Sequence, residues 1–168
     1  MGLRWGLLFF VVGGQVSMWA QSCPEGIVTL RSNYQDACAD YKSVDVVEGF
    51  MAVAENWADQ CPTAAVNRGF VAAAGLMSAG LPWNPITAWG RFNDWQPKLE
   101  ASIAEAPENP DLRFLRLGVQ LNVPAIVGYS GEIDGDLALI EKALNSGHWR
   151  QQPAYEAFVR ETIRNARP

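Results

Sequence analysis

The sequence predicts an all-α fold of about six to seven helices that pack as antiparallel hairpins in an irregular bundle. Three observations predict it. Apolar residues recur at spacings of three and four along most of the chain, and no alternating apolar and polar run is long enough to suggest a strand. Proline is favoured in a first helical turn, where its missing N–H would have no partner. Five prolines stand just before such apolar stretches: Pro24, Pro62, Pro85, Pro110 and Pro153.

The predicted helices follow these marks and are joined by short connections, which favours antiparallel neighbours. Asn84 and Asn109 precede two of the prolines and can cap the helices that follow. Gly80 and Gly147 stand where a helix end favours a left-handed residue, and Pro97 is expected to kink or split the fourth helix. The expected helices lie near 24–41, 44–59, 63–79, 85–105, 110–122, 134–146 and 152–166.

The third of these helices, near 63–79, is rich in glycine and alanine on nearly every side. Small side chains let neighbouring backbones approach closely, so we expect this helix to be central. Leu7 to Val12 form an unbroken apolar run near the N-terminus, far short of the about 18 apolar residues that a membrane span needs. With small residues before Cys23, this pattern predicts a signal peptide over residues 1–22, or a cut after Ala20, and a single helical domain over residues 23–168.

Composition limits the classes of partner. The chain has 168 residues, of which 49% are apolar and 18% charged, with a formal net charge of −5. These values exclude a disordered or collagen-like chain. Without a basic excess, nucleic acid and anionic membrane surfaces are poor partners. We expect a periplasmic or secreted protein with no transmembrane segment in its mature chain.

Export places the three cysteines in an oxidising compartment. In a hairpin of the first two helices, Cys38 lies near the turn and Cys61 lies roughly 25 Å away along the helix. Cys23 would lie beside Cys61, so the sequence predicts a Cys23–Cys61 disulfide with Cys38 buried as a small hydrophobic residue. A lipid anchor on Cys23 is the competing outcome, which the residues just before the cut do not favour.

Arginines supply the candidate ligand site. Arg91, Arg113 and Arg116 could together grip a carboxylate or phosphate through paired N–H groups, with Tyr129 and the acids near Asp134 completing a pocket. The favoured interpretation is different. Two of the arginines lie in an apolar stretch, which indicates partial burial and internal pairing, and the candidate acid partners are Glu100 and Asp94.

Histidine and acidic residues offer weaker signals. His148 is the only histidine; a zinc site usually needs more than one, and a Ser–His–Asp hydrolase would need it as its base. It follows a predicted helix end, so we expect a surface or helix-capping role. Glu132, Asp134 and Asp136 lack calcium-hand spacing and suit the positive end of the next helix. We expect no catalytic residue, metal site or cofactor.

Aromatic residues concentrate within thirteen positions, at Trp83, Trp89, Phe92 and Trp95. Trp89 and Phe92, with Ile86, fit a buried helical stripe, and core packing is the favoured interpretation of the group. Trp83 and Trp95 are the candidate partner surface, since exposed aromatic rings bind partner helices and sugar faces.

Several segments carry a family resemblance: 99–103, 107–110, 113–117, 128–130 and 133–136. Over about residues 68–145 the chain resembles a group of small exported helical proteins of Gram-negative bacteria, a group that implies no particular activity. The Pro107-Glu108-Asn109 turn, with Leu99 and Ser102 before it, is loosely similar to tetratricopeptide repeats. No second copy follows at about 34 residues, so this likeness implies repeat-like hairpins and not a true repeat array.

Together these observations favour a non-enzymatic interaction or scaffold module of the cell envelope, whose partner is another envelope protein. The alternative is a small-anion binding protein or small enzyme with a pocket near Arg113 and Arg116. An enclosed cavity with unpaired arginine and carboxylate groups would favour the alternative. An open apolar groove beside Trp83 would favour the partner.

Overall fold

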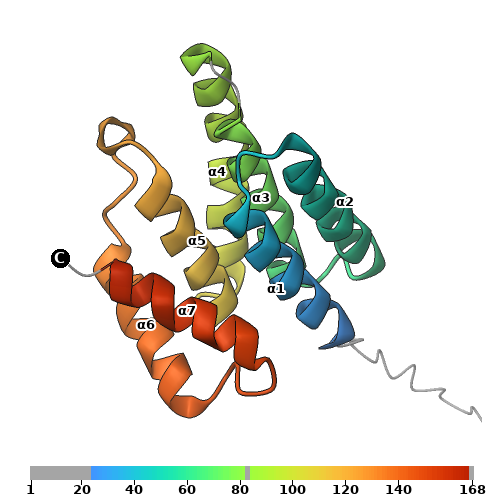
Figure 1. Ribbon diagram of the computed structural model, residues 1–168, viewed down its shortest axis with the longest axis vertical. Helices are drawn as coiled ribbons and strands as arrows, with labels where there is room; N and C mark the ends of the chain where they lie inside the picture. The colour runs from blue at the N-terminus through green and yellow to red at the C-terminus, as the bar shows by residue number, and fades with distance from the viewer. Residues whose placement is uncertain (1–23, 82–83, 167–168) are drawn as a thin grey trace, which may run out of the picture.

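The computed structural model describes residues 24–81 and 84–166, and within these ranges every regular element is helical. The all-α prediction is confirmed, and the predicted bounds lie within two residues of those observed. Figure 1 shows the arrangement. In chain order the elements are α1 (Pro24–Ala39), α2 (Val44–Gln60), α3 (Ala65–Ala79), α4 (Pro85–Glu105), α5 (Pro110–Asn122), the short 3-10 helix η1 (Ala125–Val127), α6 (Ile133–Ser146) and α7 (Pro153–Asn165).

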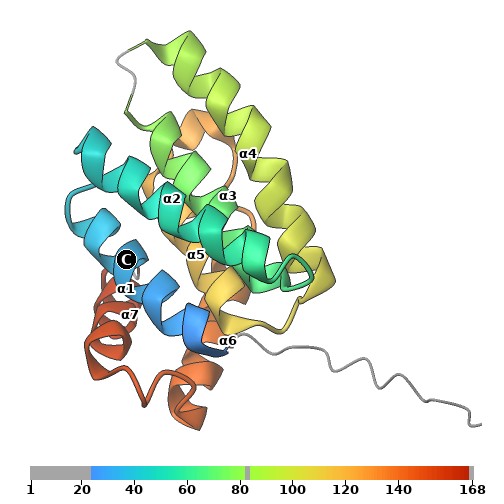
Figure 2. The ribbon, with the colours of Figure 1, turned by 90° about the vertical axis from the view of Figure 1, so that its right-hand side faces the viewer.

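Helix α3 is central, as its composition predicts. It packs against α1, α2, α4 and α5, and Figure 2 shows it between α2 and α4. Its glycines permit this closeness: a Cβ on Gly69 would lie 2.1 Å from the Leu112 side chain of α5, and one on Gly75 would lie 2.1 Å from the Trp95 ring of α4. No larger residue fits at either position without displacing its neighbour.

Helix ends confirm some of the local predictions. The Asn84 side chain accepts a hydrogen bond from the Ile86 N–H, and the Asn109 side chain accepts from Asp111 and Leu112. Gly147 is left-handed, with a φ of 78°. Gly80 was predicted wrongly, because its φ is −80° and its N–H turns back to the carbonyls of Met77 and Ser78.

Pro97 does not split its helix, since α4 runs unbroken from Pro85 to Glu105. Proline removes one backbone hydrogen bond at that position. Both Pro97 and Asn93, the residue four positions earlier, face solvent. Water can therefore satisfy the freed carbonyl, and the helix continues.

The hydrophobic core is rich in aromatic residues that α1, α2, α3, α5 and α7 contribute. Tyr34 has edge-on ring contacts with Phe70, Phe114 and Phe158, with centroids 6.1 to 6.2 Å apart. The expected buried stripe of α4 is wrong for Ile86 and Trp89, which are exposed. The N-terminal half of α4 extends past the neighbouring helix ends, as Figures 1 and 2 show, so less of it is covered. Among the described residues, no helix combines the length and apolar character that crossing a membrane requires.

Candidate functional site

An apolar groove of about 600 Å³ opens at one end of the bundle. The C-terminal halves of α1, α3, α5 and α7 line it, together with the N-terminal half of α4 and the segment that follows α5. Its walls are mainly aliphatic and aromatic, and include Leu76, Met77, Phe92, Val119 and Phe158. None of the described residues that line it is Asp, Glu, Lys, Arg or His. The groove therefore suits the apolar face of an occupant.

The rim of this groove is unusually apolar. Ile126 of η1 is 95% exposed, Trp89 of α4 is 52% exposed and Tyr41, after α1, is 51% exposed. Ile86 lies three residues before Trp89 on α4 and is 82% exposed, although it does not line the groove itself. The apolar surface thus continues outward from the groove onto the neighbouring face of α4. Contiguous exposed apolar surface of this kind marks interaction sites.

Two polar groups on α1 border the groove without bringing charge to it. Burial raises the pKa of the Cys38 thiol to about 11, although a hydrogen bond from Tyr34 opposes the rise. Burial also raises the pKa of Tyr34 well above its ordinary value. Both groups are neutral at pH 7. Cys38 is a free thiol that lines the groove and is half-buried, whereas the sequence predicted a buried residue.

Gly118 of α5 makes room for Tyr34. A Cβ at this position would lie 2.4 Å from the Tyr34 hydroxyl oxygen, and both residues line the groove. The absence of a side chain at Gly118 therefore lets the Tyr34 ring pack directly against α5.

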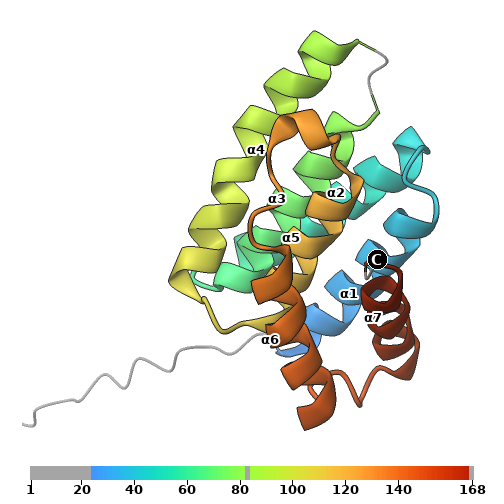
Figure 3. The ribbon, with the colours of Figure 1, turned by 90° about the vertical axis from the view of Figure 1, so that its left-hand side faces the viewer.

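The segment 123–132 connects α5 to α6 and forms one side of the groove. In Figure 3 it loops out from the end of α5 before α6 begins. Tyr129 ties it to α4: its hydroxyl donates to Glu100, and its ring meets Phe92 edge-on at 5.7 Å. Burial, and then the hydrogen bond to Glu100, raise the pKa of Tyr129 above its ordinary value. Tyr129 therefore holds the connecting segment in place and is neutral.

Arg113 and Arg116 are paired with carboxylates. Arg116 donates from Nε and Nη2 to the two oxygens of Asp136, each at 2.7 Å, and from Nη1 to Glu100 at 3.0 Å. Arg113 Nη1 also donates to Asp136, at 3.0 Å. We call these four residues the Asp136 cluster. Hydrogen bonds from Arg116 to Asp136 raise the pKa of the arginine, although burial opposes this.

This geometry shows the internal pairing that the sequence favoured. Glu100 is a partner, as expected, whereas Asp94 is not among the carboxylates that Arg113 and Arg116 contact. Asp136 is fully buried, so its main role is to neutralise two arginines and not to complement the N-terminus of α6. Asp134 stays exposed in the first turn of α6.

Arg91 lies apart from the other two arginines. Its Nη1 donates to the Ser78 carbonyl in the last turn of α3, at 2.9 Å. The three arginines of the expected anion pocket therefore do not converge, and neither Arg113 nor Arg116 has an unpaired guanidinium.

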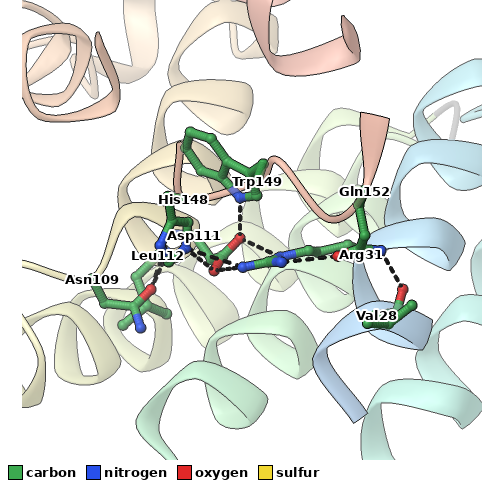
Figure 4. Close-up of polar contacts among 8 residues, drawn as sticks. All are labelled: Val28, Arg31, Asn109, Asp111, Leu112, His148, Trp149 and Gln152. Carbon is green, nitrogen blue, oxygen red and sulfur yellow. Dashed lines mark hydrogen bonds and ion pairs between the residues drawn. The ribbon is translucent and has the colours of Figure 1, made fainter. Parts of the chain in front are cut away.

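A second polar cluster, shown in Figure 4, centres on Asp111. Arg31 reaches from α1 and donates from Nε and Nη2 to the two Asp111 oxygens, at 2.8 and 2.7 Å. The Trp149 indole N–H donates to the same carboxylate at 2.9 Å, and His148 Nε2 lies 3.1 Å from it. Arg31 Nη1 donates to Gln152 at 2.8 Å. This Asp111 cluster joins α1 and α5 to the segment between α6 and α7.

The expected surface role of His148 needs correction. Its ring is two-thirds buried, and Nε2 lies within hydrogen-bond distance of both Arg31 and Asp111. These partners orient the ring within the structural cluster. Sequence reasoning missed Arg31, Asp111 and Trp149, although an arginine directly after Leu30 on the apolar stripe of α1 was a usable signal.

Asp111 makes stability depend on pH. Burial raises the pKa of this carboxyl, but hydrogen bonds from His148 and Arg31 outweigh it and hold the pKa below the ordinary 3.8. The unfolded chain then binds more protons below about pH 4, so the contribution of Asp111 is complete above this pH and is lost as the pH falls further. We expect the difference in unfolding free energy between wild type and Asp111→Asn to shrink from pH 6 to pH 3. Denaturant titrations at each pH measure it, and a constant difference would contradict the lowered pKa.

Trp95 and Trp83 were the candidate partner surface. Trp95 is half-buried against Gly75, and the Lys98 ammonium lies 3.6 Å from its ring centroid. Trp83 lies outside the described residues. Within 24–81 and 84–166, no group of three or more His, Cys, Asp or Glu side chains is arranged to hold a metal ion. A scan against protein-family models and searches of curated proteins and solved structures found no match to this chain.

Proposed function

We propose that this protein is a non-enzymatic binding module that takes an apolar helical segment of another envelope protein into its groove. The observation that carries the proposal is an uncharged groove whose apolar surface continues onto an exposed rim. An amphipathic helix that lays its apolar face into such a groove is a recurrent mode of protein recognition. The two polar clusters favour a binding role over a catalytic one, because their charged side chains are already paired with one another.

The rim favours a protein segment over a small molecule. Ile86 lies outside the groove lining, and a ligand confined to the groove would leave it in water. A helix that runs along the N-terminal half of α4 would cover Ile86, Trp89 and Ile126 together. A small apolar ligand is the second candidate, because about 600 Å³ falls within the range of roughly 300–1,000 Å³ that ligand sites occupy.

Rim variants test this function. We expect the double variant Ile86→Ala/Ile126→Ala to recover about tenfold less crosslinked partner from an envelope extract than the wild type does. Its unfolding midpoint should match wild type, because both side chains are exposed. Quantitative mass spectrometry of the crosslinked product measures the capture. Val28→Ala, also an exposed aliphatic residue but on the first turns of α1, is the matched control.

The same variants separate the two candidates. Nile red, an uncharged apolar dye, reports occupation of the groove itself by its fluorescence. Dye binding without a rim-dependent protein partner would favour the small ligand. A partner captured equally by wild type and the double variant would place its binding site elsewhere.

We propose further that residues 1–22 direct export and that Cys23 pairs with Cys61. Cys23 lies outside the described residues, so support comes from its neighbours. A Cβ on Gly26 would lie 2.6 Å from the Trp57 ring, which places the start of α1 against the last turn of α2, directly before buried Cys61. A disulfide here would stabilise the hairpin by about 2–4 kcal/mol.

Mass mapping of the protein from a periplasmic fraction tests both parts. We expect a mature chain that begins at Cys23 or Gln21, and a Cys23–Cys61 peptide that separates on reduction. Cys61→Ser should raise the free-thiol count from one to two. An unchanged count, or an acyl mass on Cys23, would refute the pairing.

A further inference from the structure

Four helices end at the groove. Most of the lining residues of α1, α3, α5 and α7 lie in their C-terminal halves, whereas those of α4 lie in its N-terminal half. A helix C-terminus carries partial negative charge, and basic side chains in its last turn commonly offset that charge. The last turns of α1, α3 and α5 contain no basic residue, and that of α7 contains Arg164. The ends of α1, α3 and α5 therefore bring partial negative charge to an otherwise uncharged groove, whereas Arg164 offsets that of α7.

At the end of α3, a basic side chain of a neighbouring helix already offsets the partial negative charge. Arg91, on α4, donates to the Ser78 carbonyl in the last turn of α3 at 2.9 Å. Near α1, Lys42 lies over the Tyr41 ring at 5.7 Å, and Asp40 follows the helix end directly. Glu161 precedes Thr162, a groove-lining residue of α7. The end of α1 therefore has no net excess of positive charge, whereas the last turn of α7 carries Arg164.

The end of α5 has no basic residue beside it in the sequence. Residues 117–131 include the last turn of α5 and the segment that borders the groove, and they contain no charged side chain. The last turn ends at Asn122, which lines the groove and uses its own amide to donate to the Gly118 carbonyl. A cation supplied by a partner would therefore meet favourable partial charge and no like charge from this segment.

We infer that the segment bound in the groove is a basic amphipathic helix, with its apolar face in the groove and a lysine or arginine against the C-terminal end of α5. This inference rests on the proposed function, since it names the chemistry of that partner. The net charge of −5 acts in the same direction, because it attracts a basic segment and speeds its association.

Three model peptides test the charge requirement. They are 14-residue amphipathic helices that share the same leucine face. All the remaining positions are lysine in the first peptide, glutamine in the second and glutamate in the third. Fluorescence anisotropy at low salt measures their affinity for the full mature protein. We expect the lysine peptide to bind about tenfold more tightly than the glutamate peptide, with glutamine between them. The difference should narrow at 0.5 M salt, where charges are screened.

Matched variants locate the cation. Leu121 lies in the last turn of α5 but outside the groove lining. Leu121→Lys therefore places a cation of the protein itself at this helix end without filling the groove. We expect it to weaken the lysine peptide three- to tenfold relative to Leu121→Gln, while the glutamine peptide binds both equally. Gln60→Lys, at the exposed end of α2 and outside the groove lining, adds the same charge and should weaken the lysine peptide much less.

The outcomes separate this inference from the proposed function. Equal binding of all three peptides, lost in Ile86→Ala/Ile126→Ala, would overturn the basic character and leave the helix-binding groove intact. Nile red binding with no peptide binding would overturn both. Rim-dependent binding to neutral phosphatidylcholine vesicles without peptide binding would also overturn both, by assigning the rim to a membrane.

Discussion

Replacing Asp111 by asparagine is expected to lower the free energy of unfolding by about 3–5 kcal/mol. The carboxylate is 2% exposed and receives two hydrogen bonds from Arg31 and one from the Trp149 indole. Asparagine has nearly the same shape but no charge, so the Arg31 guanidinium, itself 8% exposed, would stay buried without a counter-charge. Equilibrium denaturation in urea at pH 7 measures the loss.

Two comparisons make the Asp111 result specific. Asp59→Asn removes an exposed carboxylate on α2 and should change stability by less than about 0.5 kcal/mol. Adding Arg31→Met to Asp111→Asn removes the uncompensated charge and should restore part of the loss. A change of less than about 1 kcal/mol in the single variant would show that the cluster does not hold α1 and α5 together as described.

Asp136→Asn is expected to destabilise the protein by a similar amount, about 3–5 kcal/mol, for a related reason. Asp136 is fully buried and is the shared counter-charge of Arg113 and Arg116. Its loss would leave two guanidiniums facing a neutral amide. Arg116 would keep Glu100 at 3.0 Å and Glu132 at 3.7 Å, but both carboxylates are more exposed than Asp136 and compensate its charge less.

A second substitution distinguishes lost charge from lost packing at Asp136. Adding Arg113→Met to Asp136→Asn removes one of the two guanidiniums that the first change leaves without their shared carboxylate. We therefore expect the double variant to recover part of the stability that Asp136→Asn loses, as measured by urea denaturation at pH 7. No recovery would show that the arginines do not depend on Asp136 for their charge balance.

Local features of this protein were predictable from short stretches of sequence. The helix starts at Pro85 and Pro110 follow from proline chemistry and from the asparagine caps before them. The pairing of Arg116 with Glu100 was also foreseeable, because the two residues lie on consecutive helices. Each of these predictions depends on residues close together in the chain.

Other features depended on distant partners. Arg31 and Asp111 lie 80 positions apart, and no local pattern connects them. Ile86 and Trp89 follow a core-like spacing, yet both are exposed, because spacing identifies an apolar face without showing whether another helix covers it. The groove consists of parts of α1, α3, α4, α5 and α7, so its existence depends on how far each helix extends past the next.

The sequence by itself determined where the helices begin and end and that α3 is central, since propensity, capping and side-chain size act over a few residues. Tertiary packing decided which arginines are neutralised, which apolar face of α4 stays uncovered, and where four helix ends meet. Those outcomes depend on distances between segments far apart in the chain, which are established only when the bundle forms.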